Sequence, residues 1–288
     1  MAGPLAALHV DRRAEVTRRP LLIDAFPFHD ELDILELRLT ELYDTVDKFV
    51  IVEAEVTHQD EPKPSYLGDN WERFSPFHDK IVRVWATELP TMAQDADPWA
   101  REYMQREHIT TGLKVIGVES DDIVMQSDAD EIPRPICARN CLPGGGFVSF
   151  RQRGHFWAVD WQYPPGWGGT VAGTVGAIWR LGQRTGRPFG SMRSLRDGPN
   201  AAPSPPHLRD AGWHLSWLGG PERVTKKVNS FCHPEVEERI RAGIESDNFY
   251  WREGFHVDGV KMVPVEVDDT WPRWIVEGNA PESWYRPR

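Results

Sequence analysis

At 288 residues the chain is long enough for one large domain, and its 40% hydrophobic and 27% charged residues are typical of a soluble globular protein. The formal net charge of −11 excludes a general nucleic-acid binder, because nothing would offset repulsion from the phosphates. Three cysteines without zinc-ribbon spacing exclude a complete disulfide framework and predict free thiols: Cys137, Cys141 and Cys232.

No apolar run approaches the length of a membrane span. The segment Met1–Val10 is mildly apolar, but it lacks a basic start and contains Pro4, so it makes a poor signal peptide. We therefore expect a cytoplasmic protein without a membrane span.

The chain is expected to begin with a flexible arm, residues 1–19, which is followed by a single domain over residues 20–288. A first strand is predicted over Leu21–Ile23 and ends at Asp24–Phe28. The acids of Asp30–Asp33 suit a helix N-terminus, and the leucines that follow repeat at helical spacing. A strand that is followed by a helix is the first unit of an α/β pattern.

The next elements continue this alternation. Strands are predicted over Lys48–Glu53 and Lys80–Trp85, and a helix from Asp97 or Pro98 to about Val115, because Pro98 suits a first helical position. Strands that alternate with helices predict an α/β fold whose mainly parallel sheet carries helices on both faces.

The segment Asp121–Pro133 is a short apolar strand that runs into clustered acids. Asp128, Asp130 and Glu131 fall within four residues, and such carboxylates repel each other unless a cation lies between them. Hard oxygen ligands favour Mg²⁺ or Mn²⁺, which in turn favour phosphate oxygens. The carboxyl end of a strand is also where open α/β sheets bind ligands. The alternative is an acidic turn that caps the next helix.

The second half is expected to hold further strands and two helices. The strands are predicted over Gly146–Arg151, Phe156–Trp161 and Trp213–Trp217, and the helices after Gly219–Glu222 and from His233 to Ile244. Residues after Val260 are expected to be irregular.

Two stretches rich in glycine and proline, Pro164–Gly176 and Leu181–Pro206, are predicted to be loops. The second carries four arginines, which is the combination that a lid over a nucleotide diphosphate would need: Arg184, Arg187, Arg193 and Arg196. The alternative for this stretch is a disordered surface loop.

Three segments together resemble glycosyltransferase family 17, which includes the bisecting β-1,4-N-acetylglucosaminyltransferase of N-glycans. They are Asp24–Leu39 with Val46–Glu53, then Ser127–Pro133, then Gly212–Trp217, in the same order as in the family. The shared order is more specific than any one motif. The resemblance implies a GT-A nucleotide-diphospho-sugar transferase fold, with a donor half over residues 20–135, an acceptor half over 136–260 and an irregular C-terminal segment.

The resemblance also implies a metal site for Mn²⁺ or Mg²⁺. Asp130 would ligate the metal directly, Asp128 would contact it through water or contact the ribose, and Glu131 would support both. His214 is a candidate third ligand, because imidazole suits Mn²⁺. The alternative is that His214 is a core histidine.

The nucleotide donor is expected to contact several further residues. Phe26 lies where the nucleotide would begin to be held, and Glu53 ends a strand at a position that commonly contacts the base or ribose. Arg106 and Lys227 are expected to bind the diphosphate as cations. A loop acid and a solvated helix arginine are the alternatives for Glu53 and Arg106.

The implied reaction is an inverting transfer of N-acetylglucosamine or a similar sugar from a UDP-sugar to a glycan, protein or other hydroxyl acceptor. Such a displacement needs one carboxylate base. Glu222 is the candidate at a loop-to-helix turn, with Asp160 and Asp210 as rivals. The alternatives are a nucleotidyltransferase acting on a sugar phosphate, although Asp24–Asp33 lacks its glycine-rich basic loop, and a non-catalytic carbohydrate-binding protein that uses the tryptophans.

Overall fold

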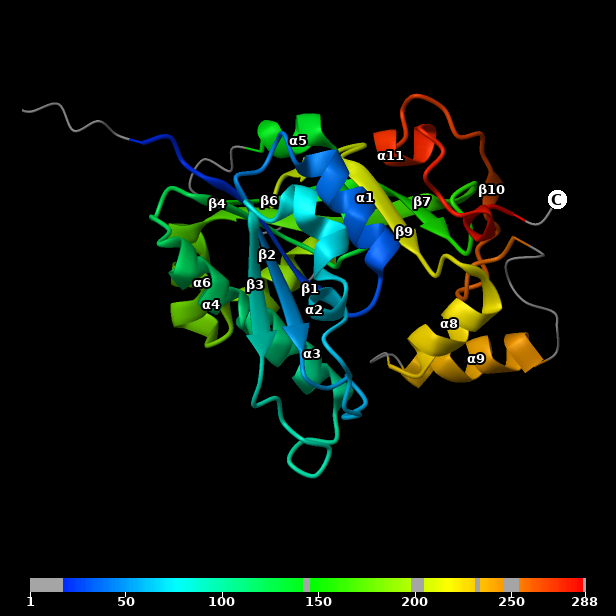
Figure 1. Cartoon of the computed structure of the whole chain (residues 1–288), viewed down its shortest axis with the longest axis horizontal. Coiled ribbons are helices and arrows are strands. Elements are labelled where there is room, and N and C mark those ends of the chain that lie inside the picture. Colours follow the sequence, from blue (N-terminus) through cyan, green and yellow to red (C-terminus); the bar gives the residue numbers. More distant parts are fainter. Residues whose placement is uncertain (1–17, 142–145, 198–204, 231–233, 246–253, 287–288) are drawn as a thin grey trace, which may run out of the picture.

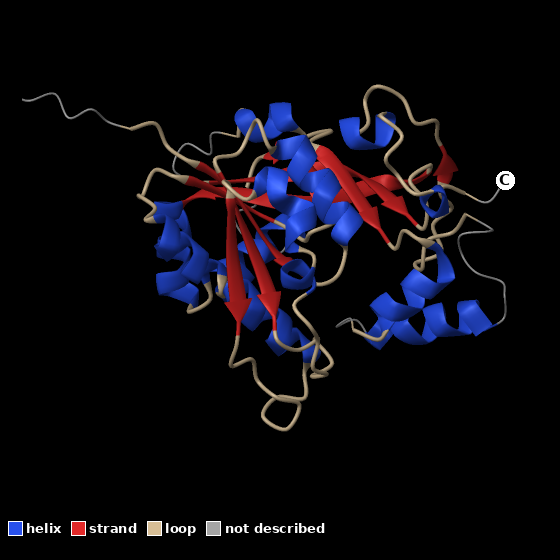
Figure 2. Ribbon diagram, viewed as in Figure 1, coloured by secondary structure: helices blue, strands red, loops and turns tan. Residues whose placement is uncertain are grey.

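The structure is a computed structural model that describes residues 18–141, 146–197, 205–230, 234–245 and 254–286. They form an α/β structure around one ten-stranded sheet (Figures 1 and 2). Within these ranges no helix has both the length and the apolar character of a membrane span. Residues 1–17 of the arm predicted over residues 1–19, and Cys232, lie outside the described residues.

The elements follow one another in the following order. The strands are β1 (Leu22–Phe28), β2 (Lys48–Ala54), β3 (Ile81–Ala86), β4 (Ile123–Gln126), β5 (Glu131–Pro133), β6 (Phe147–Phe156), β7 (Trp161–Thr174), β8 (His207–Leu208), β9 (Gly212–Ser216) and β10 (Val263–Pro264). The helices are α1 (Leu32–Leu42), α2 (Tyr66–Asp69), α3 (Pro98–Glu107), α4 (Ile109–Ile116), α5 (Pro135–Arg139), α6 (Val175–Thr185), α7 (Pro188–Ser194), α8 (Gly220–Val228), α9 (Pro234–Glu245) and α11 (Arg273–Val276), with 3₁₀ turns η1 (Trp71–Phe77), η2 (Leu195–Asp197) and η3 (Glu282–Trp284).

The sheet has the strand order β3-β2-β1-β4-β7-β6-β9-β5. Strands β3, β2, β1 and β4 run parallel. Strand β7 runs antiparallel to both β4 and β6, and β9 runs parallel to β6 but antiparallel to β5. The α/β class is therefore confirmed, whereas the mainly parallel sheet is found only in the N-terminal half; the other half is mixed.

The parallel strands are buried on both faces, as the continuous apolar runs predict. In β2, Phe49 and Ile51 pack in one core with α1, while Val50 and Val52 pack in a second core with α4, α6 and α7. Alternate side chains of a strand point to opposite faces, so one strand contributes to both cores. Helices therefore cover both faces of this half of the sheet, as predicted (Figure 2).

Helix α4 lies unusually close to the sheet at Gly112. A Cβ atom added there would meet a Cγ atom of Val50 at 2.4 Å and one of Val84 at 3.1 Å. The glycine therefore allows the helix to pack directly against β2 and β3.

Several predicted elements differ from the structure. The helix predicted over Asp97–Val115 is two helices, because the amide of His108 bonds to the carbonyl of Gln105, three residues back, and tightens the turn between them. The strand ending in the acids is also two strands, since β4 stops at Gln126 and β5 starts at Glu131.

Both predicted loops are largely regular structure. Residues 164–174 belong to β7, and residues 181–197 belong to α6, α7 and η2. In the second stretch Phe189 and Met192 are fully buried, so the segment from Leu181 to Asp197 packs onto the sheet and is not a free loop. The remainder of the predicted lid, residues 198–204, lies outside the described residues.

The C-terminal segment closes one end of the molecule. Residues after Val260 are mostly irregular, as predicted, but Trp271, Trp274 and Trp284 are buried against Ile34 of α1 and its neighbours. This segment therefore belongs to the core beside the acidic turn. The predicted division into donor and acceptor halves stays a prediction.

Candidate active site

A cavity of about 290 Å³ lies at the carboxyl ends of β1, β2 and β4. Phe28 ends β1, Thr57 and His58 follow β2, and Asp128 follows β4, so the cavity occupies the edge where open α/β sheets bind ligands. Its opposite wall comes from β9, α3, α8 and the segment α7–η2. The cations on its walls come from these separate elements: Lys63, Arg106, Arg193, Arg196 and Lys227.

The acidic turn after β4 is fixed by Arg38 of α1. The guanidinium is fully buried and makes two hydrogen bonds to Asp24, at 2.7 and 2.8 Å. It also donates to the hydroxyl of Ser127 at 2.6 Å and to the carbonyls of Asp128 and Glu131 at 2.8 and 3.0 Å. Because one rigid planar group bonds both sides of the turn, the turn has a defined shape before any ligand binds.

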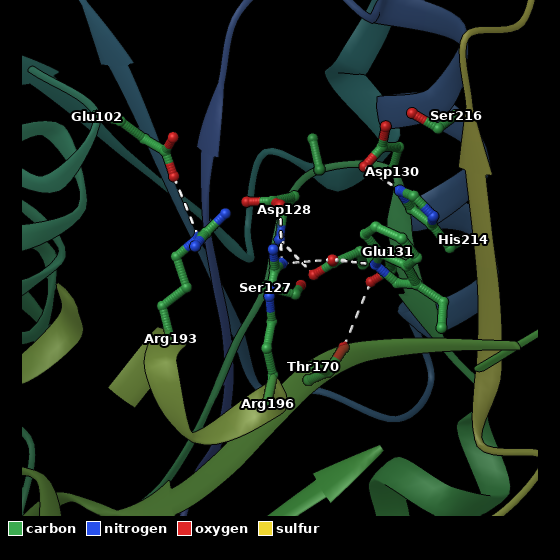
Figure 3. A network of polar contacts seen from close by, with 12 residues as sticks. Glu102, Ser127, Asp128, Asp130, Glu131, Thr170, Arg193, Arg196, His214 and Ser216 are labelled. Carbon is green, nitrogen blue, oxygen red and sulfur yellow. Dashed lines mark hydrogen bonds and ion pairs between the residues drawn. The ribbon is translucent and has the colours of Figure 1, made fainter. Parts of the chain in front are cut away.

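Asp128 lies between two arginines, from α3 and from η2. Arg106 bonds one carboxylate oxygen and Arg196 the other, at 3.0 Å for Arg196. Arg106 also bonds Glu102 at 2.7 Å, and Arg196 bonds Glu131 at 2.6 Å, as Figure 3 shows for Arg196. Burial alone would raise the pKa of Asp128, but Arg106 and then Arg196 outweigh it and hold the pKa well below its usual range.

Arg196 reaches the turn because η2 approaches β7 closely at Gly168. A Cβ atom at Gly168 would lie 2.7 Å from the carbonyl oxygen of Arg196. Arg193, one turn earlier, forms an ion pair with Glu102, at 3.2 Å, on the other side of the cavity (Figure 3). The predicted lid thus supplies two cations to the site, but from a packed helix and a 3₁₀ turn.

Asp130 faces the other wall, where it meets Lys227 and His214. Lys227 lies 3.0 Å from Oδ2, and Nε2 of His214 lies 3.5 Å from Oδ1. Burial would raise the pKa of Asp130, but Lys227 and then His214 lower it below its usual range. The His214 ring stacks on Trp167 at 4.4 Å between centroids. Asp130 is therefore ionised and paired with the ammonium of Lys227.

The residues fit a metal ion in part. A carboxylate and an imidazole are ligands that Mn²⁺ accepts, and Asp130 and His214 present them together. Within the described ranges, however, no group of three His, Cys, Asp or Glu side chains is arranged to hold a metal. Both carboxylate oxygens of Asp128 form ion pairs with arginines. A cation here would therefore have two protein ligands and would need a bound phosphate to complete its shell.

The structure brings five of the predicted site residues to this cavity: Arg106, Asp128, Asp130, His214 and Lys227. Two others lie elsewhere. Phe26 is fully buried in the core under the guanidinium of Arg38, at 4.1 Å from its ring centroid. Glu53 is buried and binds Ser65 at 2.7 Å and Lys63 at 3.2 Å, so it reaches the cavity only through Lys63.

The three predicted bases do not line the cavity, and their assignment stays a prediction. Asp160 binds Arg286 at 2.8 Å, and Asp210 pairs with Arg134 and Arg153 on the surface. Glu222 does lie in the first turn of α8, as predicted, but it is exposed. From α8 the cavity is lined by Lys227 and not by Glu222.

Sequence reasoning missed Arg38, Glu31 and Lys63. All three lie in or near the Asp24–Leu39 and Val46–Glu53 segments, but single charges on a predicted helix or loop carry no signal of their own. A buried arginine on the apolar face of α1 is the one detectable anomaly: position 38 continues the helical spacing of Leu35 and Leu42 toward the core.

Comparisons with known proteins agree with the sequence motifs. The family model described as "Glycosyltransferase family 17" matches residues 3–142. The β-1,4-mannosyl-glycoprotein 4-β-N-acetylglucosaminyltransferases of Rattus norvegicus and Homo sapiens are each 26% identical to the chain over 243 residues. These alignments cover 75% of this chain but 43% and 44% of the relatives, so the chain spans less than half of their length.

Among solved structures, the apo structure of the bifunctional glycosyltransferase WbbM matches 63% of this chain and 35% of its own, at 12% identity and a TM-score of 0.32. That similarity is too low to carry an argument. The family match and the two relatives confirm the resemblance that the motifs predicted: over residues 3–142 the chain is similar to glycosyltransferase family 17.

Proposed function

We propose that the chain is a glycosyltransferase of the GT-A type that moves N-acetylglucosamine or a similar sugar from a UDP-sugar to a hydroxyl of a glycan or other acceptor. The names of the relatives support the sugar and the reaction class. One observation of the structure carries the proposal. Cations from separate elements line a cavity at the carboxyl ends of parallel strands, and this is what a nucleotide diphosphate requires.

The charges of the cavity suit a dianionic group. Lys227 and Arg196 line it beside Asp130 and Asp128, so incoming phosphate oxygens could share or replace these carboxylates as partners of the two cations. Burial would lower the pKa of Lys227, but Asp130 and then Glu31 raise it, so the ammonium stays charged. A charged lysine stabilises the leaving diphosphate as negative charge develops on it.

Metal dependence is part of the proposal. Asp130 and His214 would hold Mn²⁺ or Mg²⁺ together with phosphate oxygens of the donor. When bound, the metal would act as a Lewis acid on the departing phosphate. Nε2 of His214 lies 3.5 Å from Oδ1 of Asp130, so Nε2 is the ring atom that would bind the metal beside that carboxylate.

A direct displacement would invert the configuration of the sugar. The acceptor oxygen attacks the anomeric carbon from the side opposite the diphosphate, while a carboxylate takes its proton. Because Trp167, Trp217 and Phe156 line the cavity, these aromatic walls would limit the access of water to the reacting carbon.

A screen of nucleotide sugars tests the proposal. The purified protein is incubated with Mn²⁺ and UDP-N-acetylglucosamine, UDP-glucose, UDP-galactose, GDP-mannose or ADP-glucose, and release of the nucleoside diphosphate is measured. We expect release from UDP-sugars above the rate without protein, with UDP-N-acetylglucosamine preferred. Release from none of them, with or without added methyl β-mannoside as an acceptor, would reject the function.

A further inference from the structure

A second cavity, of about 370 Å³, adjoins the first. Four residues line both cavities and therefore form a shared wall: Glu31, Asp130, Trp217 and Lys227. The remaining walls of the second cavity come from the start of α1, Arg73 of η1, the end of β9, the start of α8 with the turn before it, and the C-terminal segment at Ser283. A donor in the first cavity and a second molecule in the other would meet at the shared wall.

The second cavity has the chemistry of a carbohydrate site. Besides the Asp130–Lys227 pair of the shared wall, its polar wall contains two ion pairs: Asp30 with Arg223, and Asp33 with Arg73 at 2.5 Å. Paired charged side chains hold each other in place and can still form hydrogen bonds with several hydroxyls of a bound sugar. Trp217 adds an aromatic face, and flat aromatic faces stack well on sugar rings.

Trp217 is held in an uncommon backbone conformation at this wall. Its φ is +62°, in the left-handed region that bulky residues rarely adopt. Its ring packs against that of Trp157, with 5.7 Å between centroids, and Lys227 lies 5.2 Å from the ring centroid. Backbone strain of this kind persists where the surrounding structure holds it, and such positions cluster at ligand sites.

Glu31 differs from the other carboxylates of the first cavity. Glu102, Asp128 and Asp130 are each bonded to an arginine or a lysine. In the part of the chain that the structure describes, Glu31 makes no ion pair. Its Oε2 accepts the backbone amides of His29 and Asp30, at 3.3 and 3.1 Å, which fixes the carboxylate at the shared wall. A positioned carboxylate without a cation on it can accept a proton.

We propose that the second cavity holds the acceptor, a carbohydrate hydroxyl, and that Glu31 is the catalytic base. This proposal rests on the transferase function proposed above. The acceptor oxygen forms a bond to the anomeric carbon while the bond from that carbon to the phosphate oxygen breaks. The acceptor proton passes to the carboxylate of Glu31, and the electron pair of the broken bond leaves with the diphosphate.

The base is tested with Glu31→Gln, which keeps an oxygen for the two amides. Glu41→Gln is the matched control, because Glu41 is a partly exposed carboxylate of α1 that also accepts a backbone amide, from Arg273 at 2.9 Å, and lies outside both cavities. UDP release is measured with UDP-N-acetylglucosamine and methyl β-mannoside, or with water as the acceptor. Glu31→Gln should keep its UDP affinity while turnover falls about 100-fold to 10,000-fold and the acidic limb of the pH profile disappears. The control should behave as wild type.

The possible outcomes separate the two proposals. A Glu31→Gln protein that turns over within about threefold of wild type would overturn the base assignment but leave the transferase function standing. A wild-type protein inert toward every nucleotide sugar would overturn both. A Glu31→Gln protein that loses UDP affinity in proportion to its turnover would make Glu31 a donor-binding residue and would also overturn the assignment.

The acceptor cavity is tested with Ser283→Trp, which adds a large ring at an exposed position that lines the second cavity and not the first. Ser75→Trp is the control, since Ser75 is another exposed serine of a 3₁₀ helix and lines neither cavity. Ser283→Trp should raise KM for methyl β-mannoside about tenfold or more without changing UDP affinity. An unchanged KM would overturn the acceptor assignment.

Discussion

Arg38 is the single residue on which the shape of the acidic turn depends most. Its guanidinium pairs with Asp24, and both side chains are fully buried. Removing one member of a buried ion pair leaves an uncompensated charge and costs about 3–5 kcal/mol. Because Arg38 also bonds the carbonyls on both sides of the turn, its loss should disturb the cavity as well as the core.

We therefore expect Arg38→Met to lower the free energy of unfolding by about 3–5 kcal/mol in urea titrations. Arg139→Met, at an exposed arginine of α5, should change it by less than about 0.5 kcal/mol. Adding Asp24→Leu to Arg38→Met should recover part of the stability but not the binding of UDP, because the turn still lacks its donor. Full recovery of both would show that the turn holds its shape without Arg38.

Asp130 and His214 are expected to couple metal binding to donor binding. In calorimetric titrations with UDP, Mn²⁺ should raise the affinity of wild type, and Asp130→Ala should abolish this effect. His214→Ala should lower the apparent affinity for Mn²⁺ about tenfold to a hundredfold, with partial restoration by excess Mn²⁺. Asp121→Ala, at an exposed acid, is the control. Equal UDP affinity with and without Mn²⁺ in wild type would contradict metal dependence.

At the scale of elements, α4 is packed against the sheet through a glycine. Replacing a glycine by alanine in an exposed helix stabilises it by up to about 1 kcal/mol. At Gly112 the new Cβ would lie 2.4 Å from Val50, which is fully buried and cannot withdraw, and overpacking of this kind costs about 1–3 kcal/mol. The cost of overpacking at Gly112 therefore exceeds the gain from the better helix former.

Gly112→Ala should therefore lower the urea midpoint, whereas Thr111→Ala, on the exposed side of the same helix, should leave it unchanged or raise it slightly. A Gly112→Ala protein as stable as wild type would mean that α4 can move away from β2.

The elements also show which parts of the structure can be predicted from the sequence. Strands β1, β2, β3 and β4 and helix α1 were predicted, because apolar runs and helical spacing are local signals. Strand β7 was missed because Pro164, Pro165 and Gly166 suggested a loop. They lie where the register between β6 and β7 shifts, and a strand tolerates proline and glycine at such a position.

Only the part of the candidate site that lies within one short segment of the chain could be predicted from the sequence. Asp128 and Asp130 follow a buried strand, and this pattern identified them as site residues. The arginine partners of Asp128 come from α3 and η2, which are distant in sequence, and nothing in the local sequence distinguishes Arg196 from a surface arginine. The three predicted bases were placed by position along the chain, and none of them lines the cavity.

At the scale of the whole molecule, each half of the sheet supplies a different part of the candidate site. The parallel half presents the carboxyl ends of β1, β2 and β4 to the first cavity. The mixed half brings β9, with His214 and Ser216, back against the acidic turn, where β5 pairs Glu131 with His214. The C-terminal segment then closes the second cavity at Ser283. The reacting groups would meet where the two halves join.

The central claim is that this junction binds a nucleotide diphosphate. Calorimetric titration of UDP in the presence of Mn²⁺ tests it most directly, in wild type, in Lys227→Ala and in Lys114→Ala, an exposed lysine of α4. We expect wild type to bind one UDP, Lys227→Ala to bind at least about tenfold more weakly through loss of a charge-assisted contact, and Lys114→Ala to match wild type. No binding by wild type, or equal binding by Lys227→Ala, would contradict the claim.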